Sequence, residues 1–115
     1  MKTSSFKDLI VWQKSYELVK EIYKFSQKFP REEAYGLSQQ IRRSAVSIPS
    51  NIAEGYGRSF TKEYRHFLSI AYGSLCELET QYRISVDLGF GENKIAEQLI
   101  KEVGSMPWRM LNPKR

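Results

Sequence analysis

In the segment LSQQIRRSAVSIPSNIAEGYGR, residues 37–58, apolar side chains recur every three or four positions, which is the period of an α-helix. Pro49 lies inside this pattern, and we expect a bend there because proline removes one backbone hydrogen bond. Gly55 and Gly57 follow the pattern and favour the left-handed backbone of a helix end and turn. We therefore predict a proline-kinked helix over residues 34–54. Its expected core-facing residues are Leu37, Ile41, Ala45, Ile48 and Ile52.

Three further segments, on both sides of this one, have the same periodicity. We predict helices over residues 8–29, 60–88 and 93–105, which end at Pro30, Gly89 and Gly104. Their expected core-facing residues are Leu9, Trp12, Tyr16, Val19 and Tyr23 in the first, Tyr64, Phe67, Ala71, Leu75, Leu78, Tyr82 and Val86 in the second, and Ile95, Leu99 and Val103 in the last. No alternating strand pattern occurs, and short connections make consecutive helices antiparallel. The sequence predicts one all-α domain over residues 1–115, an antiparallel up-down four-helix bundle with a short fourth helix.

The composition excludes several classes of protein. Cys76 is the only cysteine, so the chain has no internal disulfide and no cysteine cluster for a metal. We find no secretory signal and no run of about eighteen apolar residues, which predicts a cytoplasmic protein with no membrane partner. Lysine and arginine number 18 against 13 aspartates and glutamates. The resulting net charge of +5 favours association with polyanions, although the same charge also serves solubility alone.

The residue types that catalysis needs do not converge. His66 is the only histidine, and Cys76 lies ten residues along the same predicted helix, about 15 Å away. That distance excludes a Cys–His nucleophilic pair within one subunit. The segment GYGR, residues 55–58, lacks the third glycine of a phosphate-binding loop and joins two helices. We therefore predict a protein that is not an enzyme, with no catalytic residue, metal site, cofactor or small-molecule substrate.

A second face of the predicted helices indicates self-association. On the helix over residues 60–88, two isoleucines and a glycine lie on a different side of the helix from the core-facing residues. Gly73 costs about 1 kcal/mol of helix propensity, which a close approach by a neighbouring backbone would explain. On the helix over residues 34–54, a polar row is either a solvated face or part of the same interface. The predicted oligomer interface consists of Arg43, Ser47, Glu54, His66, Ile70, Gly73, Glu77 and Ile84.

Basic residues form two candidate groups for binding nucleic acid. Five of them lie between residues 42 and 65, where Tyr56 and Phe60 offer rings for base stacking beside phosphate contacts. Three lysines on the first helix form a one-sided row, and pairing with Glu17 and Glu21 is the alternative explanation. No pattern indicates readout of base edges, so we expect low sequence specificity. The predicted nucleic-acid-binding residues are Arg42, Arg43, Arg58, Lys62, Arg65, Lys20, Lys24 and Lys28.

Three motifs also point to a known family. They are SIPSNIAEGYGR (residues 47–58), QIRRSAV (40–46) before it, and FLSIAYGSLCELE (67–79) after it. Over about residues 6–89 the chain closely resembles the four-helix-bundle proteins encoded in intervening sequences of bacterial 23S rRNA genes. The resemblance implies a ring-like homopentamer associated with rRNA. The chain departs from the family's pattern at its C-terminal end, where Gly104, Pro107 and Pro113 are expected to shorten the last helix.

That family is related to the accessory variability protein of diversity-generating retroelements, whose basic pentamer binds nucleic acid and a reverse transcriptase. In a pentamer, each basic patch of a +5 chain would be repeated around the ring, so weak patches would act jointly. We therefore expect a non-enzymatic oligomeric scaffold that binds nucleic acid, RNA or an rRNA-like molecule. The alternative is a protein-interaction module that docks a reverse transcriptase or a ribosomal component without touching nucleic acid.

Overall fold

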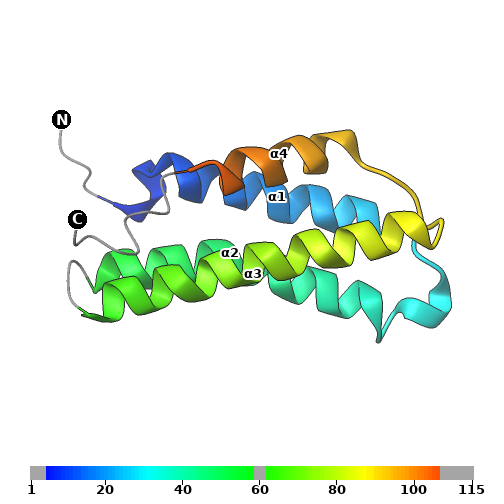
Figure 1. The fold of residues 1–115 in the computed structure, drawn as a ribbon, viewed down its shortest axis with the longest axis horizontal. Helices are drawn as coiled ribbons and strands as arrows, with labels where there is room; N and C mark the ends of the chain where they lie inside the picture. Colours follow the sequence, from blue (N-terminus) through cyan, green and yellow to red (C-terminus); the bar gives the residue numbers. More distant parts are fainter. Residues whose placement is uncertain (1–4, 59–61, 107–115) are drawn as a thin grey trace.

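The computed structural model describes residues 5–58 and 62–106, and in these ranges all regular secondary structure is helical. Figure 1 shows that successive helices run in opposite directions, which confirms the predicted all-α four-helix bundle. The elements are the 3-10 turns η1 (Phe6–Asp8) and η2 (Arg31–Glu33) and the helices α1 (Ile10–Ser26), α2 (Leu37–Gly57), α3 (Lys62–Asp87) and α4 (Lys94–Gly104).

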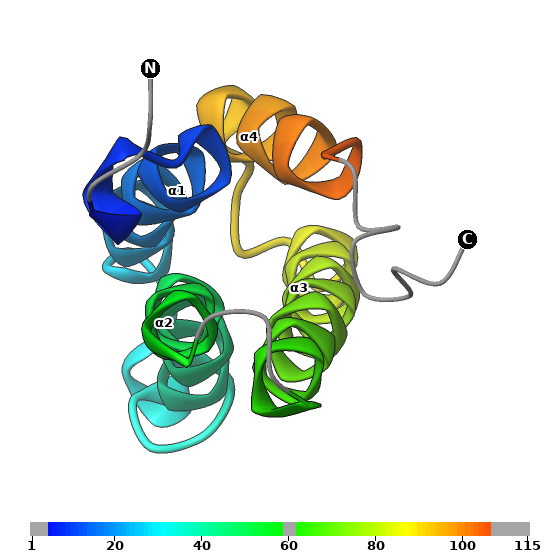
Figure 2. The same ribbon diagram turned by 90° about the vertical axis from the view of Figure 1, so that its left-hand side faces the viewer.

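The four helices surround a common core. Seen end on, they take the four corners of a square in the order α1, α2, α3 and α4 (Figure 2). The most extensive packing is between α2 and α3, while α4 packs mainly against α1 and much less against α3. The molecule is therefore a tight α2–α3 pair to which α1 and the short α4 are added.

The core-facing side of α2 is the predicted one. Ile41, Ala45, Ile48 and Ile52 are buried, and Leu37 is partly buried against the same core. The prediction for α3 is also confirmed at its centre, where Ala71, Leu75, Leu78 and Tyr82 are buried. Aliphatic side chains that recur at helical spacing leave little choice of face in these two helices.

The predicted core face of α1 is correct only in part, since Leu9, Trp12 and Val19 are partly buried against the core, while the buried residues lie on the adjacent face. Leu18, Ile22 and Phe25 are buried, whereas Tyr16 and Tyr23 are 47% and 42% exposed. Apolar residues of α1 occupy two adjacent faces, and the face without phenol groups enters the core because tyrosine can keep its hydroxyl in water. In α4 the predicted Leu99 is partly buried against the core, whereas the predicted core residue Ile95 is exposed. Its neighbours Ala96 and Ile100 are buried in its place, together with the correctly predicted Val103.

The helix ends differ from the predicted ones by a few residues. The chain turns once in η1 before α1 begins at Ile10, because Ser5 caps η1 by accepting a hydrogen bond from the Lys7 N–H at 3.1 Å. At its other end α1 stops at Ser26, so residues 27–29 lie outside it. Helix α2 begins three residues later than predicted, because η2 and a turn precede it. The predicted start of the third helix at residue 60 lies outside the described residues.

Gly55 does not end α2 as predicted, because the helix continues through Gly57. Gly55 is buried, and a Cβ atom there would lie 3.3 Å from Cβ of Phe67 and from the backbone oxygen of Tyr64. The glycine therefore lets α2 and α3 approach closely near their junction. Gly89 and Gly91 have φ angles of 83° and 125° and end α3 as predicted. Pro49 lies buried inside α2, and the bend expected there stays a prediction.

Asn93 joins α4 to the rest of the bundle. Its Oδ1 caps α4 by accepting a hydrogen bond from the Ala96 N–H at 2.9 Å. Its Nδ2 donates to Oε1 of Glu21 in α1 at 3.1 Å, and its backbone N–H donates to the Tyr82 hydroxyl in α3 at 2.9 Å. One residue thus connects three helices. None of the helices described is long and apolar enough to cross a membrane.

Candidate nucleic-acid and subunit interfaces

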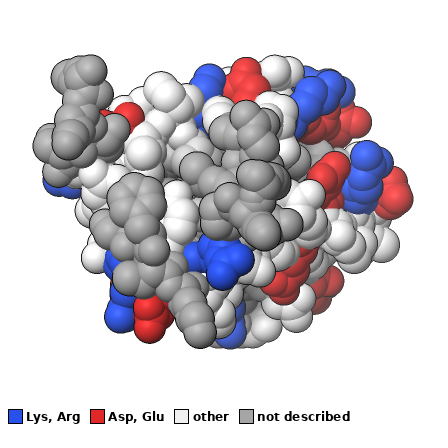
Figure 3. All heavy atoms as spheres, turned by 60° about the vertical axis from the view of Figure 1, so that its left-hand side comes forward, with Lys and Arg blue, Asp and Glu red and all other residues white. Residues whose placement is uncertain are grey.

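The predicted basic group between residues 42 and 65 is divided by the length of α2. Arg42 and Arg58 are sixteen residues apart on this helix, which corresponds to about 24 Å. Arg58 therefore lies at the end of α2 that meets α3, over the ring of Phe67, and Arg42 lies beside α1. On the face that Figure 3 shows, the lysines and arginines of the described residues stand in separate groups, with acidic side chains beside several of them. The side chain of Lys62 is not among the described ones.

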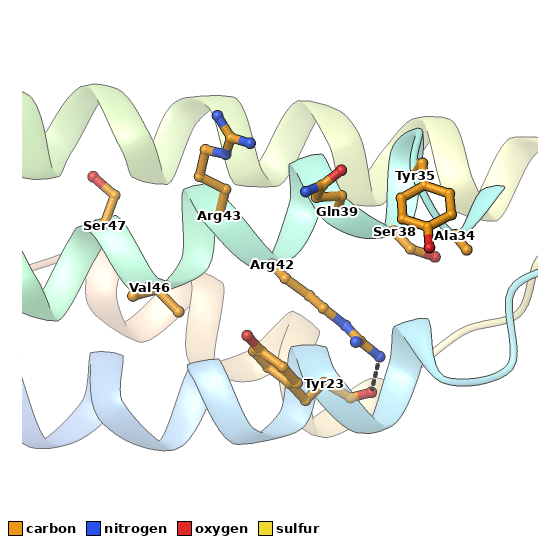
Figure 4. A pocket seen from close by; sticks show the side chains of 9 residues that line it. All are labelled: Tyr23, Ala34, Tyr35, Ser38, Gln39, Arg42, Arg43, Val46 and Ser47. Carbon is orange, nitrogen blue, oxygen red and sulfur yellow. Dashed lines mark hydrogen bonds between the residues drawn. The ribbon is translucent and has the colours of Figure 1, made fainter.

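Arg42 is fixed between α2 and α1. Its Nε donates to Oγ of Ser26 at 2.7 Å, and its guanidinium lies 4.5 Å from the centroid of the Tyr23 ring. A second, longer bond of 3.4 Å reaches the backbone oxygen of Tyr23 (Figure 4). Arg42 therefore holds two helices together, and its charge stays at the surface beside an exposed ring.

The other arginines differ in how far they are engaged. Arg43 extends away from α1 in Figure 4, is exposed, and makes no ion pair or hydrogen bond to any residue that the structure describes. Arg65 is also exposed and has no such partner within the described part of the chain. Arg58 pairs with Glu54 at 2.9 Å and lies 5.3 Å from the ring centroid of Phe67. Arg43 and Arg65 are thus the cations of this group most available to a ligand.

The lysines of α1 and the loop after it do not act as one row. Lys20 pairs with Glu17 at 3.1 Å, and Lys24 pairs with Glu21 at 3.2 Å, which is the alternative that the spacing left open. Lys28 is exposed and has no partner in the described ranges. Surface pairs of this kind contribute at most about 1 kcal/mol, so an anionic ligand can displace them.

The predicted interface residues on α3 lie on one open surface. His66, Ile70, Gly73, Glu77 and Ile84 are all exposed, with Ile70 at 37% and Ile84 at 45%. A Cβ atom added at Gly73 would meet no described residue within 4 Å, so packing against the described part of the chain does not explain this glycine. Two exposed isoleucines on one helix face leave apolar area in water that a second chain can cover.

The predicted interface residues on α2 are already engaged within the chain. Oγ of Ser47 lies 2.7 Å from Oγ of Ser74 and accepts a hydrogen bond from Asn51 at 2.9 Å, so Ser47 serves the contact between α2 and α3. Glu54 is exposed and pairs with Arg58. Of the α2 residues assigned to the interface, Arg43 alone has no partner within the described residues.

Sequence reasoning missed a groove between α1 and α2. It consists of two hollows of about 570 and 450 Å³, and Val46 lines both of them. Among the described residues, three cations line the groove, Lys20, Arg42 and Arg43, and no carboxylate does. The signal that could have revealed it is the Trp12–Tyr16–Val19–Tyr23 row, which the sequence analysis assigned to the core. The aromatic side chains that line the groove are Trp12, Tyr16, Tyr23 and Tyr35.

The carboxylates with shifted pKa values serve structural contacts. Hydrogen bonds from Asn93, Tyr82 and Lys14 lower the pKa values of Glu21, Glu97 and Glu102, respectively. The main hydrogen-bond partner is a different residue for each of these three glutamates. In the described residues no three His, Cys, Asp or Glu side chains lie together as a metal site would require. His66 is exposed, and its ring packs edge-on against Phe67 with centroids 5.2 Å apart.

The architecture defines the class of protein first, an antiparallel four-helix bundle with a basic net charge. The family model of the 23S rRNA-intervening sequence protein matches residues 7–112, and the chain belongs to this family. A crystal structure of a protein of unknown function from the S23 ribosomal protein family of Bacteroides thetaiotaomicron has the same fold, with a TM-score of 0.74. It is 23% identical in sequence, and the match covers 90% of this chain and 99% of that one. No curated protein matches the chain.

Proposed function

We propose that this protein is a non-enzymatic, oligomeric scaffold that binds nucleic acid, most notably RNA, with low sequence specificity. The observation that carries the proposal is the set of exposed cations without partners among the described residues, Arg43, Arg65 and Lys28, on a chain of net charge +5. Cations that no carboxylate neutralises are free to replace the counterions of a phosphate backbone. The family is named for 23S rRNA and the structural neighbour for a ribosomal protein family, which favours RNA among polyanions.

Low specificity follows from the kind of contact. Phosphate contacts fix the position of a nucleic acid without reading its bases, and these three cations lie on different parts of the surface. A single chain would bind weakly through so few charges. In a homo-oligomer each cation is repeated, and the second and later contacts become intramolecular. The proposal therefore joins nucleic-acid binding to self-association.

The exposed apolar face of α3 supports the oligomeric part of the proposal. Ile70, Gly73 and Ile84 share this face, and all three are exposed in the part of the chain that the structure describes. The same face also suits a second candidate function, in which a protein partner docks there. That partner would be a ribosomal component or a reverse transcriptase, and nucleic acid would not touch this protein at all.

A salt titration of RNA affinity separates the two candidates. We expect the logarithm of the binding constant to fall linearly with the logarithm of salt concentration, because cations on the protein release counterions. The double variant Arg43→Gln, Arg65→Gln should bind more weakly and with a smaller slope. A matched control, Arg83→Gln with Lys94→Gln, removes the same charge from residues that pair with Glu79, Glu92 and Glu97.

The outcomes are distinct. Weaker binding by the first double variant than by the control supports the proposed cations. Equal losses in both double variants would assign the binding to net charge alone and contradict the assigned residues. No binding at low salt would reject nucleic-acid binding and favour the protein-docking module, and an affinity that does not depend on salt would reject the proposed phosphate contacts.

A further inference from the structure

Along the surface between α1 and α2, large aromatic side chains remain in contact with water. Tyr16 and Tyr23 are nearly half exposed, and Tyr35 at the start of the groove is 91% exposed. The core does not use these rings, since Leu18, Ile22 and Phe25 supply the buried face of α1. Exposed rings gathered along one groove indicate a binding surface more than scattered apolar residues would.

Contacts with neighbouring side chains hold two of these rings in place. Tyr16 stacks on Trp12 with ring centroids 4.9 Å apart and planes 26° from parallel. Nζ of Lys20 lies 5.4 Å from the centroid of Tyr16, and the guanidinium of Arg42 lies 4.5 Å from that of Tyr23. The rings are therefore preorganised, so a ligand that stacks on them loses little side-chain freedom in the protein.

The spacing of the two rings suits two bases of the same strand that are about three nucleotides apart. Tyr16 and Tyr23 are seven residues apart on α1, which places them on the same face and about 10 Å apart along the helix. That distance equals the rise of about three stacked nucleotides at about 3.4 Å each. Tyr23 lines one hollow and Tyr16 lines the other, and Val46 lines both.

The charge of the groove indicates what kind of ligand enters it. The described residues that line it include three cations and no carboxylate, although Lys20 pairs with Glu17 beside the groove, and this balance matches an anionic ligand. Two copies of the chain meeting groove to groove would place these cations against one another at a cost. A double helix would present phosphates to the cations but would hide its base faces from the rings. A single strand offers both groups at once.

We propose that the α1–α2 groove binds unpaired bases of a single-stranded nucleic acid. Tyr16 and Tyr23 would stack on the bases, and Lys20 and Arg42, which lie beside these rings, would contact the flanking phosphates. This inference rests on the proposed function and names the form of nucleic acid and its site. Stacking is tolerant of sequence because every base has an aromatic face, so the groove adds preference for single strands without adding base readout.

The test compares three polyanions at one low salt concentration: an oligoadenylate of about ten nucleotides, a duplex of the same length, and an inorganic polyphosphate of similar charge. We expect the single strand to bind most tightly. Tyr16→Leu and Tyr23→Leu should each weaken its binding by about 5- to 100-fold, the range for loss of one aromatic stacking partner. Tyr16→Phe and Tyr23→Phe keep the ring and should bind like the parent protein. Tyr72→Leu, an exposed tyrosine on α3, is the control away from the groove.

Each outcome decides the matter. Equal affinity for all three polyanions, with no effect of the two leucine substitutions, would overturn this inference and leave the proposed function intact. If the parent protein binds none of the three polyanions, both this inference and the proposed function are wrong. If the leucine variants instead change the assembly mass by light scattering while circular dichroism stays helical, the groove is a contact between subunits and the inference is wrong.

Discussion

The hydroxyl group of Tyr82 on α3 donates a hydrogen bond of 2.6 Å to Oε2 of Glu97 on α4. The same hydroxyl accepts a bond from the backbone N–H of Asn93, whose side chain reaches Glu21 on α1. These bonds lie where α3 and α4 have little other contact. They therefore tie the shortest helix to the bundle at one end, while the ion pair of Lys14 with Glu102 at 2.8 Å ties it to α1 further along.

Burial, followed by the bond to Glu97, raises the pKa of Tyr82 to about 12. The pKa of Tyr82 in the folded state lies above the ordinary value of 10. The contribution of the protonated Tyr82 hydroxyl to the free energy of unfolding is therefore fully present below about pH 10. It is lost as the pH rises from there through about 12. Ultraviolet titration should show one tyrosine that ionises near this pKa. That step should be missing in Tyr82→Phe, and its persistence in the variant would contradict the assignment.

At low pH, the lowered pKa values of Glu21, Glu97 and Glu102 predict that the folded state loses stability as the pH falls. Groups whose pKa is lower in the folded state stabilise it above their unfolded value, about 4.5, and lose this effect as the pH falls through the folded value. The unfolding free energy in urea should therefore decrease below about pH 4.5.

A pair of variants tests that acid dependence. Glu102→Gln removes the partner of Lys14 and should reduce the loss of stability on acidification. Glu32→Gln removes an exposed carboxylate that has no hydrogen bond or ion pair with a described residue, so the acid dependence should stay as in the parent. The assignment fails if both variants retain the full dependence.

The orientation of α1 gives a prediction of its own. Leu18 is fully buried and Tyr16 is 47% exposed. Leu18→Ala should lower the unfolding free energy by about 2–5 kcal/mol, because it leaves a cavity in the core. Tyr16→Ala should lower it by much less. Urea unfolding of the two variants measures the difference, and a larger loss in Tyr16→Ala would restore the face that the sequence predicted.

This contrast also shows how far the sequence predicts the structure. Helix α2 has a single apolar face, and periodicity identified it correctly down to Ile52. Helix α1 has two apolar faces. Periodicity alone does not predict that Leu18 and Ile22 are more deeply buried than Trp12 and Tyr16, because the choice of face depends on the side chains that α2 and α4 pack against α1.

The candidate sites were harder to predict for a related reason. Arg42 could be recognised as basic, but its bonds to Ser26 and to the Tyr23 carbonyl join residues at least sixteen positions apart in the sequence. The pairing of Lys20 with Glu17 was foreseen as an alternative because it is local. Contacts within one helix can be read from spacing, whereas contacts between helices need their relative rotation.

Gly73 and Ile70 on α3 give the sharpest test of self-association. A Cβ atom at Gly73 would have no described residue within 4 Å, and alanine is about 1 kcal/mol better than glycine inside a helix. If the chain functioned as an isolated bundle, Gly73→Ala would simply stabilise it.

If a second copy packs against this face, then Ile70→Asp and Gly73→Arg place charge in that contact and should split the assembly while the helical circular dichroism survives. Light scattering measures the mass, and Ile95→Asp, on an exposed isoleucine of α4, should leave it unchanged. An unchanged mass in Ile70→Asp as well would place the contact between copies elsewhere, because a buried, unpaired carboxylate at the centre of an interface could not be tolerated.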